Sequence, residues 1–256
     1  LRGILEWEKK VLVRFKKERI NNIPSPNDYF LDKSILLRDS YTGKHGDYQL
    51  PAELLQNEPY LVMERIHGDT LEGMIGTQAL HRGREIRLLH LAKEILTIFI
   101  RMHRKFDIRG QEAYFIYQDL KPANILVSGA DYFTLIDLGG VTLRLGDKTT
   151  EPTAGMVTYG YAPPEGEIDG GVRIDHRFDI YTLGATLWHA FTEIDPRDLP
   201  GNFPRLDPSK IESVASRQTA DIIARALEPN LDRRYGHAAH MRKDIVTVLR
   251  AYGEPV

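Results

Sequence analysis

The spacing of apolar residues changes along the chain and predicts two parts of different structure. Residues 3–18 carry apolar side chains three or four positions apart with charged residues between them, which predicts a helix. Residues 21–28 contain two prolines and three asparagines and are predicted to form a loop. The apolar runs YFL and ILL that follow are typical of a strand or hairpin, and PYLVM at 59–63 is typical of a short buried strand. Residues 38–58 are polar and turn-rich, which indicates a surface insertion.

From residue 70 onward the pattern is mainly helical. Helices are predicted at 70–78, near 85–104 and 177–192, and two or more between 211 and 252. The only clear strands expected in this part are the pair around the segment YFIYQDLKPANILV. The pattern therefore predicts a small mixed lobe, a connector at 64–68 and a larger helical lobe.

Polar and charged residues gather between the two predicted strands. Asp119 follows a strand-like run and precedes Pro122, which cannot continue a β-ladder, so its carboxylate is expected in a rigid loop. Asn124 and Asp137 flank a predicted tight hairpin that would bring them side by side. Two oxygen-bearing side chains beside Lys121 suit Mg²⁺ carrying a polyphosphate. Taken singly, each is more simply explained as a turn residue or a solvated charge.

Taken together, the strings D-L-K-P-A-N and D-L-G resemble the catalytic loop and metal-binding turn of protein kinases. The resemblance implies that Asp119 accepts or orients the proton of the substrate hydroxyl and that Lys121 holds the transferred phosphoryl group. It also implies that Asn124 and Asp137 coordinate the Mg²⁺ that accompanies ATP.

Three later strings extend this resemblance. VTYGYAPPE resembles the end of a kinase activation segment, DIYTLG the start of the central helix, and LEPNLDRRYG an arginine-bearing turn near the domain end. The resemblance implies an ion pair between Glu165 and Arg234, and it implies that Asp179 holds the catalytic-loop backbone. Thr158 stands where serine/threonine kinases carry a threonine that contacts the catalytic aspartate and lysine. The expected phosphoryl acceptor is therefore a protein serine or threonine.

The string PYLVMERIHGDTL resembles the fifth strand and hinge of a kinase. The resemblance implies that Met63 is the gatekeeper and that the backbone from Glu64 to Ile66 faces the adenine edge of ATP. It also implies that Asp69 lies near the ribose and that Leu126 forms the floor under the adenine.

The predicted first helix takes the place of the kinase regulatory helix, where Glu8 would hold the strand-three lysine near ATP. That lysine is expected before Leu1, and no two glycines here are spaced as G-x-G. An alternative takes VLVR at 11–14 as the strand that carries this lysine, with Arg14 in its place. That alternative is rejected, because the regulatory helix would then have to form from ERINNIPSPND, whose prolines and asparagines prevent a helix. The expected fold is α+β and bilobal, with a truncated small lobe in 1–68 and a mainly α-helical large lobe in 69–256.

Three functional interpretations stay open at this point. The first is an N-terminally truncated piece of an active serine/threonine kinase, which alone would have little or no phosphotransfer activity. The second is a pseudokinase that acts as a scaffold or regulator. The intact catalytic residues and the otherwise unused Glu8 favour the first interpretation. The third is a phosphotransferase of the aminoglycoside or choline type, disfavoured by the lysine-proline after Asp119 and by the activation-segment string.

Departures from the kinase motifs indicate which type of protein kinase the chain resembles. Tyr117 and Gln118 replace the usual histidine and arginine, so activity is not expected to depend on the usual phosphate–arginine pair. Leu138 replaces phenylalanine and is still expected to pack internally, and these variants resemble bacterial-type kinases. Three threonines of the activation segment are candidate phosphorylation sites or simply part of a polar loop: Thr149, Thr150 and Thr153.

Composition narrows the remaining possibilities. The 256 residues are 42% hydrophobic and 27% charged, which argues against disorder, and a net charge of -2 argues against nucleic acid as a partner. The absence of cysteine excludes disulfides and thiolate zinc sites and fits a reducing, cytoplasmic location. The longest apolar stretch, 88–100, is too short to span a bilayer. His237 and His240 are expected to be surface residues rather than metal ligands. Nothing in the sequence indicates the oligomeric state.

Overall fold

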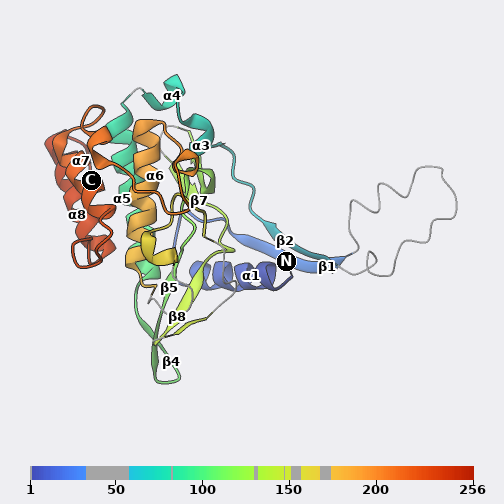
Figure 1. The fold of residues 1–256 in the computed structure, drawn as a ribbon. Helices are drawn as coiled ribbons and strands as arrows, with labels where there is room; N and C mark the ends of the chain where they lie inside the picture. Colours follow the sequence, from blue (N-terminus) through green and yellow to red (C-terminus); the bar gives the residue numbers. More distant parts are fainter. Residues whose placement is uncertain are drawn as a thin grey trace.

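The computed structural model describes residues 2–32, 58–81, 83–129, 132–146, 148–150, 157–167 and 174–256. The first part consists of one helix and a two-stranded antiparallel sheet (Figure 1). Helix α1 (Arg2–Lys17) confirms the first predicted helix and includes the VLVR segment, so that segment is not a strand. The predicted insertion at 38–58 lies outside the described residues except for Glu58, which belongs to a strand, and the ILL run lies outside them too.

Strand β1 (Pro26–Asp32) pairs with β2 (Glu58–Met63), and β2 confirms the predicted PYLVM strand. The predicted loop over 21–28 is wrong at its end, because Pro26 already belongs to β1. Proline is tolerated there because it is the first residue of the strand, where its missing N–H interrupts no ladder. The register shifts between Pro26 and Asp28, as the chain enters the strand.

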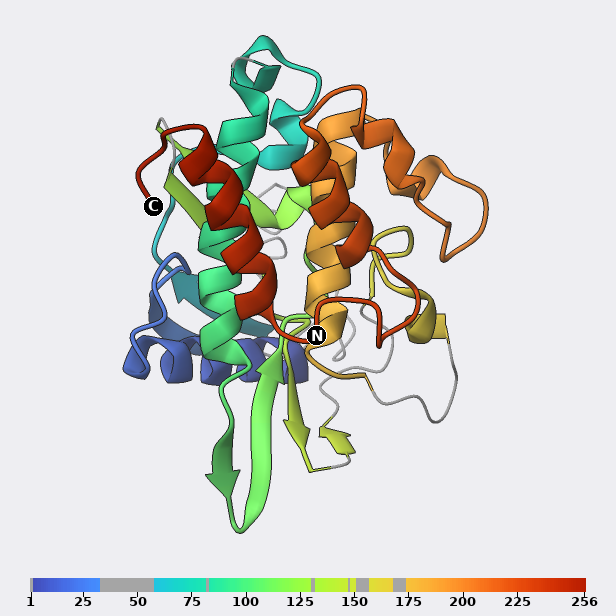
Figure 2. The ribbon, with the colours of Figure 1, turned by 90° about the vertical axis from the view of Figure 1, so that its left-hand side faces the viewer.

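The helices of the second part confirm the predicted helical lobe. Helix α8 packs on α5 and α7 packs on α6, and Figure 2 shows the four helices together above α1. The four are α5 (Arg84–Met102), α6 (Arg177–Thr192), α7 (Arg217–Ala226) and α8 (Ala238–Ala251). The described segments between these helices contain the short 3₁₀ turns η2 (Pro122–Asn124), η3 (Pro164–Glu167), η4 (Pro196–Asp198) and η5 (Pro208–Ile211).

The single helix predicted at 70–78 is wrong. The structure has two separate turns, α3 (Leu71–Met74) and α4 (Gln78–His81). Ile75 leaves the helical region with a ψ of 133°, and Gly76 follows with a φ of 78°, a conformation that glycine adopts readily. The apolar spacing continues across this break, so the periodicity alone does not reveal it.

The expectation of only one pair of strands in this part is also wrong. The chain forms two further sheets, with strand orders β3-β6-β7 and β4-β5-β8-β9. The strands are β3 (Asp69–Thr70), β4 (Phe106–Ile108), β5 (Gln111–Ile116), β6 (Ile125–Ser128), β7 (Tyr132–Leu135), β8 (Thr142–Leu145) and β9 (Lys148–Thr150). Most have only two to four residues, too few for an alternating pattern to be recognised.

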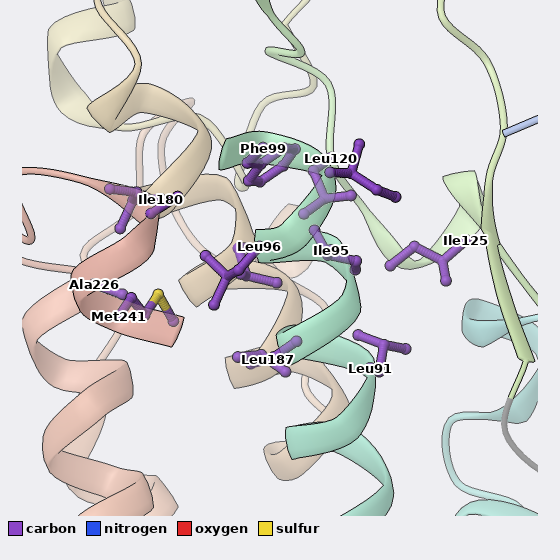
Figure 3. Close-up of a cluster of buried hydrophobic side chains, with 14 of the residues drawn as sticks. Leu91, Ile95, Leu96, Phe99, Leu120, Ile125, Ile180, Leu187, Ala226 and Met241 are labelled. Carbon is purple, nitrogen blue, oxygen red and sulfur yellow. The ribbon is translucent and has the colours of Figure 1, made fainter. Parts of the chain in front are cut away.

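A continuous apolar core joins α1, the four long helices and the loop after β5. Figure 3 shows Leu91, Ile95 and Phe99 of α5 beside Leu120 of that loop and Ile125 of β6. Helices α6 and α7 approach closely at Gly184, where an added Cβ would lie 2.9 Å from Cβ of Ala226. The core therefore holds the polar loop after β5 on a rigid helical base.

Candidate active site

The loop after β5 is held by a buried carboxylate. Asp179, in the first turn of α6, is fully buried and accepts hydrogen bonds from the backbone N–H groups of Tyr117 at 2.9 Å and Gln118 at 2.8 Å. The Nε2–H of His103, at the end of α5, donates to Asp179 Oδ2 at 2.7 Å. Three donors thus compensate the burial of this charge and fix the loop backbone before Asp119.

Asp119 lies at the centre of a small hydrogen-bonded triangle. Its Oδ1 accepts from the Thr158 hydroxyl at 2.5 Å, and its Oδ2 accepts from Lys121 Nζ at 2.7 Å. Lys121 Nζ also lies 2.8 Å from Thr158 Oγ1. The side chains of Asp119 and Lys121 are 13% and 20% exposed, so they remain accessible to a substrate. Residues from two distant segments thus meet as the sequence predicts.

Asn124 closes the other side of this loop. Its Nδ2 donates to the backbone oxygen of Asp119 at 2.9 Å and lies 3.2 Å from Asp119 Oδ2. Its backbone oxygen accepts from Ile136 N at 2.9 Å, across the β6–β7 hairpin that the sequence predicts. That bond brings Asp137 next to Asn124 in the fold. The amide orientation leaves Oδ1 of Asn124 without a donor among the described residues, which suits a metal ligand.

The turn after β7 presents Asp137 and connects it to α1. Asp137 is exposed, has a φ of 60°, and accepts at Oδ1 from Gly139 N at 3.3 Å. The next residue, Leu138, is buried, and its N–H donates to Glu8 Oε1 at 3.1 Å. Burial and the charge of Asp137 raise the pKa of Glu8, although the Leu138 N–H opposes this effect. Within the described residues, Glu8 has no cationic partner.

Two of the predicted ATP-binding residues lie on the paired strands β3 and β6. Asp69 and Thr70 of β3 pair with Val127 and Leu126, which places the predicted ribose and adenine-floor residues on neighbouring strands. Gly68 precedes them with a φ of 157°, and an added Cβ would lie 2.3 Å from the backbone oxygen of Val127. Only glycine fits so close an approach of the two backbones.

The remaining hinge positions continue β2. Met63 is half-buried at the end of this strand, and Ile66 is half-buried beyond it. Glu64 N donates to Ser25 O at 2.9 Å, which fastens the start of the hinge to the loop before β1. Residues 64–68 lead from β2 to β3, and β3 pairs with β6, the strand that follows the loop carrying Asp119.

Tyr117 and Gln118 have clear structural roles. The Tyr117 hydroxyl donates to Ile136 O at 2.6 Å, and burial raises the pKa of this phenol well above its ordinary value. Gln118 is buried with a φ of 66° and brings no positive charge toward the activation segment. Arg144 of β8 is buried and donates to the backbone oxygens of Ile174 at 2.7 Å and Gly146 at 3.1 Å.

Sequence reasoning missed His103 and Arg144. His103 contacts Asp179, 76 positions away, and Arg144 contacts the backbone oxygen of Ile174, 30 positions away. No local spacing in the sequence indicates contacts over such separations. The predicted pair of Glu165 and Arg234 does form, with oxygen–nitrogen distances of 2.5 and 3.1 Å. The Arg234 side chain is fully buried, so this pair ties η3 to the turn before α8.

These elements and contacts define a protein kinase catalytic domain, and comparison with known proteins agrees. A family model described as protein kinase domain matches residues 48–245. The chain therefore belongs to the protein kinase family, and its relatives place it among bacterial-type serine/threonine kinases.

Three relatives illustrate the similarity. Serine/threonine-protein kinase PknB of Mycobacterium tuberculosis is 29% identical over 222 residues, which cover 82% of this chain and 33% of PknB. Probable serine/threonine-protein kinase SCO3848 of Streptomyces coelicolor is 29% identical over 215 residues, covering 77% and 29% of the two chains. Serine/threonine-protein kinase D of Synechocystis is 28% identical over 211 residues, covering 78% and 38%. The chain spans about a third of the length of these curated relatives.

Proposed function

We propose that the protein transfers the γ-phosphoryl group of ATP to a serine or threonine hydroxyl of a protein substrate. The observation that carries this proposal is the triangle of Asp119, Lys121 and Thr158. The Asp119 carboxylate is held between the Lys121 ammonium group and the Thr158 hydroxyl, and Asp179 hydrogen-bonds to the backbone of its loop. Such a carboxylate is preorganised to accept a hydroxyl proton.

Each member of the triangle has one role in the proposed reaction. An Asp119 oxygen orients the acceptor hydroxyl and accepts its proton as the hydroxyl oxygen bonds to the γ-phosphorus, in line with the breaking bond to the oxygen that leaves with ADP. Lys121 Nζ neutralises charge on the transferred phosphoryl oxygens, and Thr158 keeps both side chains in place. Asn124 and Asp137 would hold Mg²⁺, which supplies charge neutralisation and orientation of the phosphates.

The proposed ATP site continues along β2, β3 and β6. The backbone from Glu64 to Ile66 faces the adenine edge, with Met63 behind it and Leu126 beneath it. Asp69, beside β6, lies near the ribose. Glu8 organises the metal-binding turn through the Leu138 N–H and is placed to hold a lysine that orients the phosphates.

The acceptor can be tested directly with the full-length protein, radiolabelled ATP and Mg²⁺. Acid hydrolysis of a phosphorylated generic protein substrate is expected to release phosphoserine and phosphothreonine without phosphotyrosine. An aminoglycoside and choline, assayed in parallel, are expected to accept no phosphate. Label on either small molecule in place of the protein would contradict the proposed substrate class.

A second candidate function is a pseudokinase that serves as a scaffold or regulator. Residues 1–256 contain no G-x-G string, and Glu8 lacks a cationic partner among the described residues. We propose for the same reason that the 256-residue chain alone transfers phosphate slowly. Calorimetric titration of the full-length protein with ATP, with and without Mg²⁺, separates the two functions. The kinase is expected to bind ATP more tightly with Mg²⁺, whereas a pseudokinase without a nucleotide site shows no binding in either case.

We further propose that the domain acts in the cytoplasm, where ATP and protein substrates are present and thiols are reduced. The absence of cysteine and the family's use of ATP support this location. Within the described residues, no helix combines the length and apolar character needed to cross a membrane.

A further inference from the structure

A basic pocket lies where the C-terminal ends of α1 and α5 meet β4, apart from the catalytic triangle. Its volume is about 590 Å³, within the range of small-ligand sites. The residues that line it are Glu18, Arg19, Arg101, Arg104, Lys105 and Phe106. None of them takes part in the proposed phosphotransfer.

Two cations at this pocket are neutralised within the protein. Arg14 Nε lies 2.5 Å from Glu18 Oε1, and its guanidinium lies over the Phe106 ring at 4.8 Å. Lys105 Nζ lies 2.7 Å from Glu112 Oε1. These pairs shape the wall of the pocket and leave little net charge of their own.

Three guanidinium groups at the pocket have no carboxylate partner among the described residues. They belong to Arg19, Arg101 and Arg104, all of which are exposed. Arg101 Nη1 donates to the backbone oxygen of Arg19, so the two arginine segments are fastened together. Arg19 has a φ of 55° and sits just beyond the end of α1.

The positive charge of these three guanidinium groups exceeds what is needed to offset the partial negative charges at the C-terminal ends of α1 and α5. Cations near a helix C-terminus offset a partial charge of about −0.5, so two helix ends account for roughly one positive charge. Three unpaired guanidinium groups therefore leave a surplus of roughly two. A phosphate monoester carries a charge of about −1.5 to −2 at neutral pH, which matches this surplus.

We propose that this pocket binds the phosphate of a phosphoserine or phosphothreonine side chain on a peptide. An arginine guanidinium can donate two parallel hydrogen bonds to phosphate oxygens, and Phe106 offers an apolar surface for the side-chain carbons that bear the phosphate. Glu18 and Glu112 are paired with cations and Asp107 lies beside the pocket, so the unpaired positive charge is confined to three guanidinium groups, which suits one phosphate rather than an extended polyanion such as nucleic acid.

The test is calorimetric titration of the protein with a short phosphothreonine peptide and its unphosphorylated twin, without ATP or Mg²⁺. The phosphorylated peptide is expected to bind at least tenfold more tightly than its twin. Inorganic phosphate is expected to compete with it at higher concentration. Lys121→Gln is expected to leave this binding unchanged, which separates the pocket from the catalytic site.

The variant Arg101→Gln/Arg104→Gln is expected to lose at least tenfold in affinity for the phosphorylated peptide. Arg217→Gln/Arg250→Gln removes the same charge from exposed positions on α7 and α8 and is expected to bind normally. Thermal melting establishes that each variant is folded. Arg104→Gln alone, which removes no hydrogen bond within the described residues, is expected to weaken binding several-fold if the double variant does not fold.

Several results would overturn the proposal. Equal affinity for the two peptides, or full affinity in the folded double variant, excludes a phosphate site at this pocket. Binding of inorganic phosphate without binding of the peptide excludes a peptide ligand. Binding to phosphatidylserine vesicles that is lost in the double variant, with no peptide binding by the unaltered protein, identifies a membrane-facing patch instead.

Discussion

At the residue scale, the site depends on side chains that hold one another in place. Thr158 contacts both Asp119 and Lys121, at 2.5 and 2.8 Å, although it lies 39 positions from the first and 37 from the second. Its hydroxyl therefore connects the activation segment to the catalytic loop. Such positioning contacts affect rate more than substrate binding, because small displacements of reacting groups are costly.

Thr158→Ala is predicted to lower kcat about 10- to 100-fold with little change in KM for ATP. Thr158→Ser keeps the hydroxyl and is the matched control, with kcat within about threefold of the unaltered protein. Steady-state kinetics of the full-length protein provide the comparison. Equal kcat values for the alanine and serine variants would show that the hydroxyl does not position the catalytic pair.

Much of the site could be predicted from short strings of residues, although not from any residue taken singly. Asp119, Lys121, Asn124 and Thr158 fall in short strings whose order alone suggests a kinase, and the structure brings them into contact. His103 could not be predicted, because its partner Asp179 lies 76 positions away. Contacts of this length depend on how helices pack, which no local spacing expresses.

At the element scale, the crossing of α6 and α7 requires a residue without a side chain. An added Cβ at Gly184 would lie 2.9 Å from Ala226 Cβ and 3.3 Å from the Leu227 side chain. Helix α6 carries Asp179 in its first turn, so its position also sets the catalytic loop. A shift of α6 is therefore expected to reach the active site.

Gly184→Ala is predicted to destabilise the protein by about 1–3 kcal/mol, because overpacking outweighs the better helix propensity of alanine. Gly236→Ala is the matched control, since its added Cβ meets nothing within 4 Å. The control is expected to be neutral or slightly stabilising, by up to about 1 kcal/mol. Urea unfolding measures both values, and a neutral Gly184→Ala would show that the helices adjust freely.

Element boundaries show where sequence patterns are informative. Long apolar-rich helices such as α5 and α6 were predicted within one or two residues of their observed ends. Strands β4 and β9 escaped prediction because each has only three residues, which gives no usable alternation, although each pairs with a strand next to it in sequence.

At the scale of the whole molecule, a group of histidines connects several helices. The His176 ring stacks on His237 at 4.8 Å and lies 5.5 Å from His103, and its Nε2–H donates to Gly236 O at 2.8 Å. Burial lowers the pKa of His176, and the neighbouring histidines add to this effect while Asp175 opposes it. His237, the residue before α8, and His240 are both exposed, as the sequence predicts.

The unfolding free energy is predicted to fall as the pH drops below the ordinary histidine pKa of about 6.5. There the unfolded chain binds protons that the folded chain, with its lowered His176 pKa, does not yet accept. Urea midpoints at several pH values between 5.5 and 7.5 measure this slope. His176→Gln is expected to flatten it, and His67→Gln, which alters an exposed histidine, is expected to leave it unchanged. A steeper slope in His176→Gln would contradict the sign of the pKa shift.

The central claim is that Asp119 performs the proton transfer in protein phosphorylation. The most direct test compares Asp119→Asn with Asp107→Asn, an exposed control on β4, in a radiolabelled ATP assay of the full-length protein. Asp119→Asn is predicted to lower kcat by about 10²- to 10⁴-fold with unchanged ATP affinity, and the control to keep full activity. A kcat for Asp119→Asn equal to that of the unaltered protein would contradict the assignment.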